Sequence, residues 1–246
     1  MEKNFKLTIE YDGTEFHGWQ RQKQDRTIQG EIEGALLVMT GKKVNLIGSG
    51  RTDAGVHALE QVANFSCRTR LDPNAFLNGL NSLLPDAIVI QNCEIVSADF
   101  HARFDVRRKT YHYRILNRRL PTAIKRQYSW YVRRPLDRAA MRRAAAELVG
   151  THDFKTFEGT GSPRPDSIRQ VFTATFFETE KDYLVFEIEA DGFLRFMVRS
   201  IVGTLVAVGL GKIGPEDFRT ILNSQDRSQA GVTAPPQGLF LVRVTY

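Results

Sequence analysis

The order of short apolar patterns in the first part of the chain is the feature that most constrains its fold. Residues 4–13, NFKLTIEYDG, alternate apolar and polar side chains, which is typical of a half-buried strand ending in an Asp-Gly turn. From Thr27, a candidate N-cap, apolar residues recur at helical spacing until Gly41. Asp72 followed by Pro73 opens a second helix in the same way. With further strands predicted at 42–48, 58–67 and 87–96, the order becomes strand, helix, strand, strand, helix, strand.

The second part of the chain repeats this order without repeating the sequence. Its patterns predict strands at 127–132, 168–180, 182–190 and 238–246, and helices over 136–149, from about 193 to 210 and from 215. Both parts suit antiparallel sheets with helices on one face, an α+β layering. We therefore expect two ferredoxin-like (RRM-like) βαββαβ halves, residues 1–105 and 106–246, with the seam near 103–110. The Gly/Pro/Ser-rich segment 158–167 is expected to be a mobile loop.

Several classes of protein are disfavoured by composition. Cys67 and Cys93 are the only cysteines and form no C-x-x-C pair, so a disulfide framework or a cysteine zinc site is not expected. The charged, alternating N-terminus lacks the apolar core of a signal peptide. The longest apolar stretch is about a dozen residues, against the roughly 20 that span a bilayer. We expect a cytoplasmic protein in a reducing compartment.

Positive charge is concentrated in one segment of the chain. The whole chain has a formal net charge of +6, but residues 103–143 hold fourteen Lys or Arg and only two acidic residues. Such asymmetry favours a polyanionic partner, although a solvated basic face is the alternative. The segment also contains aromatic residues that either stack on unpaired bases or form strand core: Tyr111, Tyr113, Tyr128, Trp130 and Tyr131.

A glycine-rich loop within 45–65, NLIGSGRTDAGVHALEQVANF, carries the pair Arg51 and Asp53. No Gly-Lys-Ser/Thr follows, so it is not a P-loop. A strand follows rather than a helix, so it is not a dinucleotide fingerprint. The Asp either caps a turn or presents a nucleophilic carboxylate kept ionised by Arg51 or another arginine. The residues alone leave both interpretations open.

Other candidate residues are equally ambiguous. Arg195 and Arg199 lie four apart on a predicted apolar helix, so they share a face and need either a carboxylate partner or access to solvent. The hydroxyl of Tyr111 is either a proton donor or acceptor, or part of the core. The histidines at 57, 101 and 152 show no ligand spacing, and no metal is expected.

Motifs along nearly the whole chain resemble the tRNA pseudouridine synthase A family, which acts on the tRNA anticodon stem-loop. The motifs are YDGTEFHGWQRQ, TIQGEIEGAL, GSGRTDAGVHALEQVANF, RKTYHYRI, GTHDF, DGFLRFMVRSIVG and APPQGLFLVRV. The combination of GRTDAGVHA with the MVR helix is far more specific than a glycine-rich loop alone. The resemblance implies isomerisation of uridine to pseudouridine at tRNA positions 38, 39 and 40. It implies no cofactor and no metal, and a homodimer whose partner is the tRNA anticodon arm.

The resemblance also assigns roles to four residues. Asp53 matches the nucleophile, and Arg51 matches the arginine that helps to flip and hold the target nucleotide. Tyr111 matches the tyrosine that stacks on the uracil and is a candidate for assisting deprotonation. Arg199 matches the arginine that pairs with the catalytic aspartate, which implies a catalytic cleft between the two halves.

Two other functions compete with this one. A non-catalytic RNA-binding module with tandem RRM-like halves would have a similar topology, but the aromatic RNP signature is missing and such a module needs no Asp in a glycine loop. An aspartate-dependent phosphatase or hydrolase would need an acidic pair near Asp53 to hold a metal, and the sequence has none there.

Overall fold

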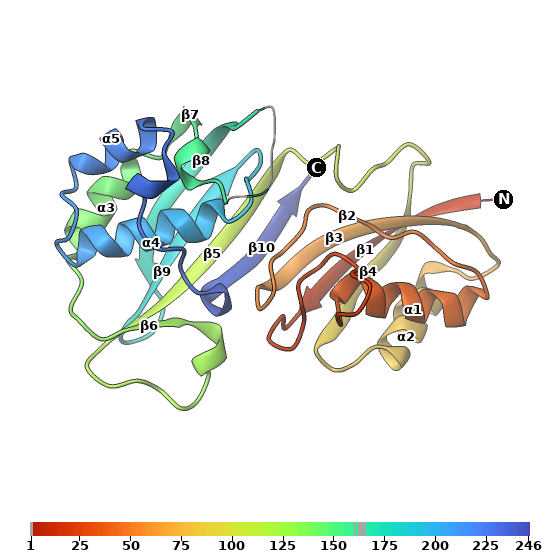
Figure 1. The fold of residues 1–246 in the computed structure, drawn as a ribbon. Helices are drawn as coiled ribbons and strands as arrows, with labels where there is room; N and C mark the ends of the chain where they lie inside the picture. The colour runs from red at the N-terminus through yellow and green to blue at the C-terminus, as the bar shows by residue number, and fades with distance from the viewer. Residues whose placement is uncertain (1, 160, 162–165) are drawn as a thin grey trace. The chain divides into compact units, whose positions relative to one another are not determined.

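A computed structural model describes residues 2–159, 161 and 166–246 of the chain (Figure 1). The fold is mixed α+β, and it divides into two compact units. Unit 1 comprises Met1–Arg107 and Phe240–Tyr246, and unit 2 comprises Arg108–Leu239. Residues 160 and 162–165 of the expected loop at 158–167 lie outside the described residues.

Unit 1 follows the strand and helix order that the sequence predicts. Its elements are β1 (Glu2–Tyr11), α1 (Ile28–Thr40), β2 (Ile47–Gly48), β3 (His57–Arg68), α2 (Pro73–Leu83), β4 (Ile88–Val96) and β10 (Leu239–Thr245). Strand β1 pairs antiparallel with both β4 and β3, and β2 pairs antiparallel with β3. The two helices contact each other, and α2 packs against β4.

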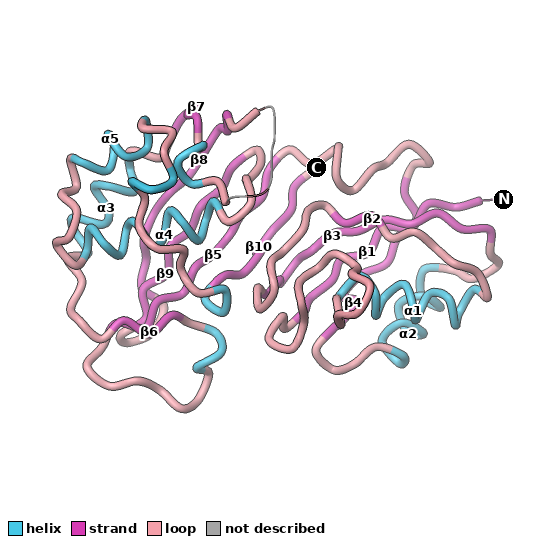
Figure 2. Tube along the Cα trace, in the orientation of Figure 1, coloured by secondary structure: helices cyan, strands magenta, loops and turns pink. Residues whose placement is uncertain are grey.

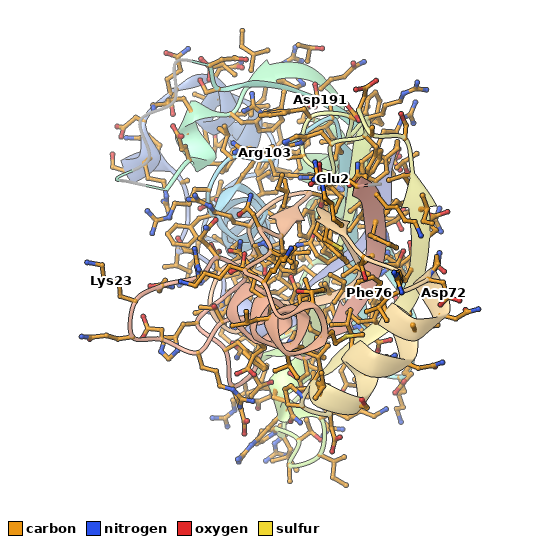
Figure 3. All side chains as sticks on the ribbon, turned by 90° about the vertical axis from the view of Figure 1, so that its right-hand side faces the viewer. Glu2, Lys23, Asp72, Phe76, Arg103 and Asp191 are labelled. Carbon is orange, nitrogen blue, oxygen red and sulfur yellow. The ribbon has the colours of Figure 1, made fainter. Side chains whose placement is uncertain are left out.

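Local signals set the ends of both helices in unit 1. The Oγ1 of Thr27 accepts a hydrogen bond from the backbone N–H of Gly30, and Gly41 ends α1 with a φ of +68°. The Oδ1 of Asp72 accepts from Ala75 N at 2.8 Å at the start of α2, where Pro73 occupies the first helical position (Figure 3). These caps confirm both predicted helix starts.

The core of unit 1 is built around three phenylalanines from three elements. Phe5 on β1 lies 5.3 Å from Phe65 on β3. Phe76, on α2 (Figure 3), lies 4.7 Å from the ring of Phe5 and 5.2 Å from that of Phe65. All three are essentially buried. Burying such rings contributes about 1.5–3 kcal/mol each, so this cluster fixes α2 on the sheet.

Strand β10 comes from the far end of the chain and pairs parallel with β3, with Phe240 opposite His57 and Leu241 opposite Ala58. The Tyr246 hydroxyl donates to Ala102 O at 2.7 Å. The expected halves, 1–105 and 106–246, place this strand in the second half, whereas the compact units place it in the first. Parallel pairing with a partner so distant in sequence leaves no local signal.

In unit 2 the helices are grouped beside the strands (Figure 2). Its elements are β5 (Arg108–Asn117), β6 (Trp130–Val132), α3 (Arg138–Ala146), β7 (Gly150–Asp153), β8 (Ile168–Glu178), β9 (Tyr183–Ala190), α4 (Met197–Gly209) and α5 (Asp217–Asn223). Short 3-10 helices span Arg126–Tyr128, Lys155–Phe157, Arg227–Gln229 and Pro236–Gly238. The strands run β5-β9-β8-β7 in antiparallel pairs, and β6 pairs parallel with β5.

Two elements of unit 2 differ from the sequence expectation. Helix α4 begins at Met197 rather than near 193, because Phe196 takes a φ of +61° that a right-handed helix cannot contain. Strand β7 was not expected, since four residues are too few to show a period. Among the described residues, every helix is too short or too polar to cross a bilayer.

Candidate active site

The loop that carries Arg51 and Asp53 spans residues 49–56, between β2 and β3. It leaves the sheet where Ser49 N donates to Val62 O at 2.7 Å, and it returns at His57, the first residue of β3. Arg51 is exposed and Asp53 is half-buried. The sheet therefore holds both ends of a short loop that carries a half-buried carboxylate.

Asp53 lies at the first position of a tight turn. Val56 N donates to Asp53 O at 3.2 Å, and Gly55 has a φ of +76°, as a type II turn requires at its third residue. Segment 13–19 holds the turn on both sides. Gly55 N donates to Phe16 O, and Trp19 N donates to Thr52 O at 3.1 Å. The backbone next to Asp53 is therefore fixed before any substrate binds, as a catalytic group requires.

Two glycines allow this segment to approach the loop. A Cβ at Gly13 would lie 2.1 Å from Val56 O, and a Cβ at Gly18 would lie 2.5 Å from Thr52 O. Gly18 also has a φ of +89°. Any side chain at either position would push the two backbones apart. The two glycines of YDGTEFHGW therefore allow segment 13–19 to pack against the Asp53 loop.

Buried polar side chains support the loop from the sheet. Tyr11 is 2% exposed, and its hydroxyl lies 2.8 Å from Thr52 Oγ1. Burial raises the pKa of Tyr11 well above its usual range, so it stays neutral. Gln61 accepts from Ser49 Oγ at 2.6 Å and donates to Gly50 O at 3.0 Å. The loop is thus anchored by neutral groups.

His57 is a member of the site that the sequence interpretation missed. It is 2% exposed and stacks on Phe240 with ring centroids 4.6 Å apart. Its Nδ1 lies 3.1 Å from Gly13 N and 3.0 Å from Asp12 Oδ1. A neutral ring protonated on Nε2 accepts from Gly13, whereas a protonated ring donates to Asp12. The only sequence signal for including His57 in the site was its position four residues after Asp53 in the GRTDAGVHA motif.

Arg51 does not pair with Asp53. Its Nε donates to Gln20 Oε1 at 2.8 Å, and its guanidinium forms no ion pair with any described residue. Of the two sources considered for a cation beside Asp53, Arg51 at i−2 is therefore excluded for this conformation. Arg51 is instead an exposed residue of the loop.

Tyr111 lies on β5 in unit 2. Its ring is buried and meets Phe193 edge-on, with centroids 5.0 Å apart. Tyr113, on the same face, is fully buried and donates to Pro235 O at 2.7 Å, and burial raises its pKa. His112, on the opposite face, lies 2.8 Å from Glu187 Oε2. Tyr111 and Tyr113 are thus buried, whereas Tyr128, Trp130 and Tyr131 are only partly buried.

Arg199 lies in the first turn of α4 and is half-buried. Its Nε donates to Ala234 O at 2.8 Å, and its guanidinium carbon lies 5.0 Å from the Phe196 ring. Arg195 lies over the same ring at 4.7 Å but precedes the helix, so the expectation that both arginines share a helix face is wrong. The positive φ of Phe196 separates Arg195 from the helix that carries Arg199.

The candidate residues thus fall into two groups. Arg51 and Asp53 share one loop of unit 1, and Tyr111 and Arg199 lie on β5 and α4 of unit 2. Within the described residues, no three His, Cys, Asp or Glu side chains are grouped so that they could hold a metal ion. The chemistry available is that of a positioned carboxylate, arginines and a buried phenol.

Comparisons with known proteins bear on this arrangement. The sequence model of a family described as tRNA pseudouridine synthase matches residues 7–105 and 144–246. Proteins named tRNA pseudouridine synthase A are 48% identical over 244 residues in Thermoanaerobacter sp. (strain X514) and in Acetivibrio thermocellus, and 47% identical in Clostridium acetobutylicum. Each alignment covers 99% of this chain and 100% of the relative.

Solved structures are more distant. A chain in a crystal structure of a Cbf5-Nop10-Gar1 complex has a TM-score of 0.38 and 13% identity, covering 96% of this chain and 48% of that chain. A score this low supports no inference about function. The sequence relatives are decisive because they match end to end and the family match includes the Asp53 loop. The chain belongs to the tRNA pseudouridine synthase family.

Proposed function

We propose that the chain converts uridine to pseudouridine at positions 38, 39 and 40 of the tRNA anticodon stem-loop, with Asp53 as nucleophile and no cofactor. The activity on tRNA uridine follows from the family, and the positions follow from the motifs that resemble it. The observation that carries the residue assignment is the loop at 49–56. Its backbone is anchored on both sides of a half-buried carboxylate.

The reaction rearranges bonds within one nucleotide. The bond between C1′ and N1 breaks, the uracil rotates, and C1′ bonds to C5, which then loses its proton. No electrons enter or leave, so an isomerase of this kind needs no redox partner. The Asp53 carboxylate adds to C1′ or to C6 and is released when the new glycosidic bond is complete. A base must accept the C5 proton, and Tyr111 or Asp53 itself is available by residue type.

The target base must leave its stack before Asp53 can reach it. Extrusion costs a few kcal/mol, and contacts with the RNA must offset it. Arg51 is exposed on the same loop as Asp53, which supports a role in holding the flipped nucleotide. We propose that Tyr111 stacks on the uracil and that Arg199 acts with Asp53 on the same uridine. If they act as a unit, Asp53→Asn and Arg199→Leu will be non-additive in a double-mutant cycle.

The strand orders support the ferredoxin-like halves expected from the sequence. Unit 1 has the order β4-β1-β3-β2, which is that of a βαββαβ sheet, and unit 2 shows β5-β9-β8 for the corresponding strands. We further propose a symmetric homodimer. Light scattering at micromolar concentration should give twice the mass of 27.9 kDa, and a monomer would contradict it.

The test uses tRNA transcripts with tritium at C5 of uridine. Wild type should release tritium, and Asp53→Asn should not. Asp99→Asn, a change at an exposed site outside the loop, is the matched control and should behave as wild type. Transcripts that keep a single uridine at position 38, 39 or 40 map the sites. If wild type binds tRNA tightly but releases no tritium, the non-catalytic RNA-binding function replaces this one.

A further inference from the structure

Unit 2 carries a groove lined mainly by arginines. Strands β5 and β6 lie side by side (Figure 1) and pair in parallel, with Asn117 opposite Val132. Because parallel strands end at the same edge, the residues that follow them emerge side by side. The arginine groove so formed has a volume of about 680 Å³ and is lined by Arg118, Arg119, Arg133, Arg134 and Arg138 with Asn117, Pro135 and Leu136.

We propose that the arginine groove binds the phosphate backbone of tRNA. This inference rests on the proposed function for the identity of the RNA. It assigns the binding to named residues within unit 2, whereas the charge of segment 103–143 indicates only a polyanionic partner.

The groove is preorganised by one buried side chain. Asn117 Nδ2 donates to Val132 O at 2.9 Å and to Arg134 O at 2.7 Å, and its Oδ1 accepts from Leu136 N at 3.3 Å. These three hydrogen bonds fix the backbone of 132–136 against the end of β5. The groove therefore keeps its shape without a ligand, which lowers the entropic cost of binding.

The arginines divide into two kinds. Arg118 donates to Leu120 O and Pro121 O at 2.8 and 3.0 Å, and Arg138 pairs with Glu178 at 2.6 Å, so these two serve the fold. The side chains of Arg119, Arg133 and Arg134 are exposed. Among the described residues none of these three guanidinium groups has a hydrogen bond or ion pair.

Three guanidinium groups without an ion pair carry like charges at one groove and repel one another. No acidic side chain lines the groove to neutralise them. Guanidinium groups bind phosphate oxygens through paired, charge-assisted hydrogen bonds. A groove of this volume exceeds what a single phosphate fills. A nucleic-acid backbone supplies the repeated charge that matches several arginines in one place.

Binding of tRNA to Arg133→Gln/Arg134→Gln tests the inference. Losing two phosphate contacts reduces the slope of log K against log salt by about 1.4–1.8. The Kd at 0.1 M salt should rise roughly 25- to 60-fold, and the difference from wild type should shrink to about threefold at 0.5 M. Arg133→Lys/Arg134→Lys keeps both charges and should recover most of the slope, which separates charge from damage to the fold.

Arg143→Gln/Lys212→Gln is the matched control, because it removes two exposed positive charges of unit 2 that do not line the groove. It should bind as wild type does. If both glutamine variants weaken binding equally, or if neither does, the groove is only a solvated basic surface and the inference is overturned. Tritium release by wild type in the same tRNA preparation checks the proposed function separately, so its failure is distinguishable from that of the groove.

Discussion

Replacing Gly18 by alanine tests whether the close approach of two backbones positions the catalytic loop. The new Cβ would lie 2.5 Å from Thr52 O and 3.1 Å from Ala54 N, on both sides of Asp53. Ordinary van der Waals contact begins at 3.4 Å. Thr52 and its neighbours must therefore move by about 1 Å, and a displacement of that size near a reacting group costs roughly 10²-fold in rate.

The stability cost has two sources. A φ of +89° is unfavourable for alanine by about 1–2 kcal/mol, and overpacking against Thr52 O adds about 1–3 kcal/mol. The free energy of unfolding should therefore fall by about 2–5 kcal/mol. This loss is a large fraction of the stability of a typical domain but leaves a folded population at low temperature.

Gly41→Ala provides the control within the same unit. Gly41 has a φ of +68°, and nothing lies within 4 Å of a Cβ there. It should lose only about 1–2 kcal/mol and keep its rate. Urea unfolding gives the two stabilities, and single-turnover tritium release gives the two rates. If folded Gly18→Ala reacts as fast as Gly41→Ala, the contact between segment 13–19 and the loop does not set the position of Asp53.

Three further results are expected. Arg199→Leu should abolish tritium release with a modest loss of tRNA affinity, and normal turnover would remove Arg199 from the site. Asn117→Ala should lower the free energy of unfolding by about 2–3 kcal/mol in urea, because three backbone groups lose their partner. Burial raises the pKa of Cys93 to about 12, so native protein should resist thiol reagents at pH 8. Between pH 9 and about 12 only the unfolded thiol ionises, so the free energy of unfolding should fall as the pH rises through this range. The fall should be smaller in Cys93→Ala.

Where a prediction needed only local chemistry, the sequence was sufficient. Thr27 and Asp72 cap the helices that their positions predict, and alternation of apolar residues places β1 correctly. A cap or a period is a property of a few consecutive residues, so tertiary contacts did not override it.

Non-local chemistry could not be predicted from the residues. The start of α4 depends on the positive φ of Phe196, which is a backbone conformation rather than a composition. The pairing of β10 with β3, the hydrogen bond that Gly13 N donates to His57 and the one that Asn117 donates to Val132 O join segments that are not adjacent in the chain. The residues alone left Asp53 as either a turn cap or a nucleophile, and only the resemblance favoured the nucleophile. A capping Asp and a catalytic Asp look alike until their neighbours in space are known.

The charge distribution shows how folding changes the meaning of a sequence feature. The net charge of segment 103–143 overstates its free positive charge, because acids outside the segment neutralise part of it. Arg108 pairs with Glu189 at 3.0 Å, and Arg138 pairs with Glu178. Three arginines without an ion pair among the described residues, Arg119, Arg133 and Arg134, lie after β5 and β6 and line one groove. Folding thus places five arginines of the segment around one groove, and it is this placement, rather than the total charge, that argues for a phosphate ligand.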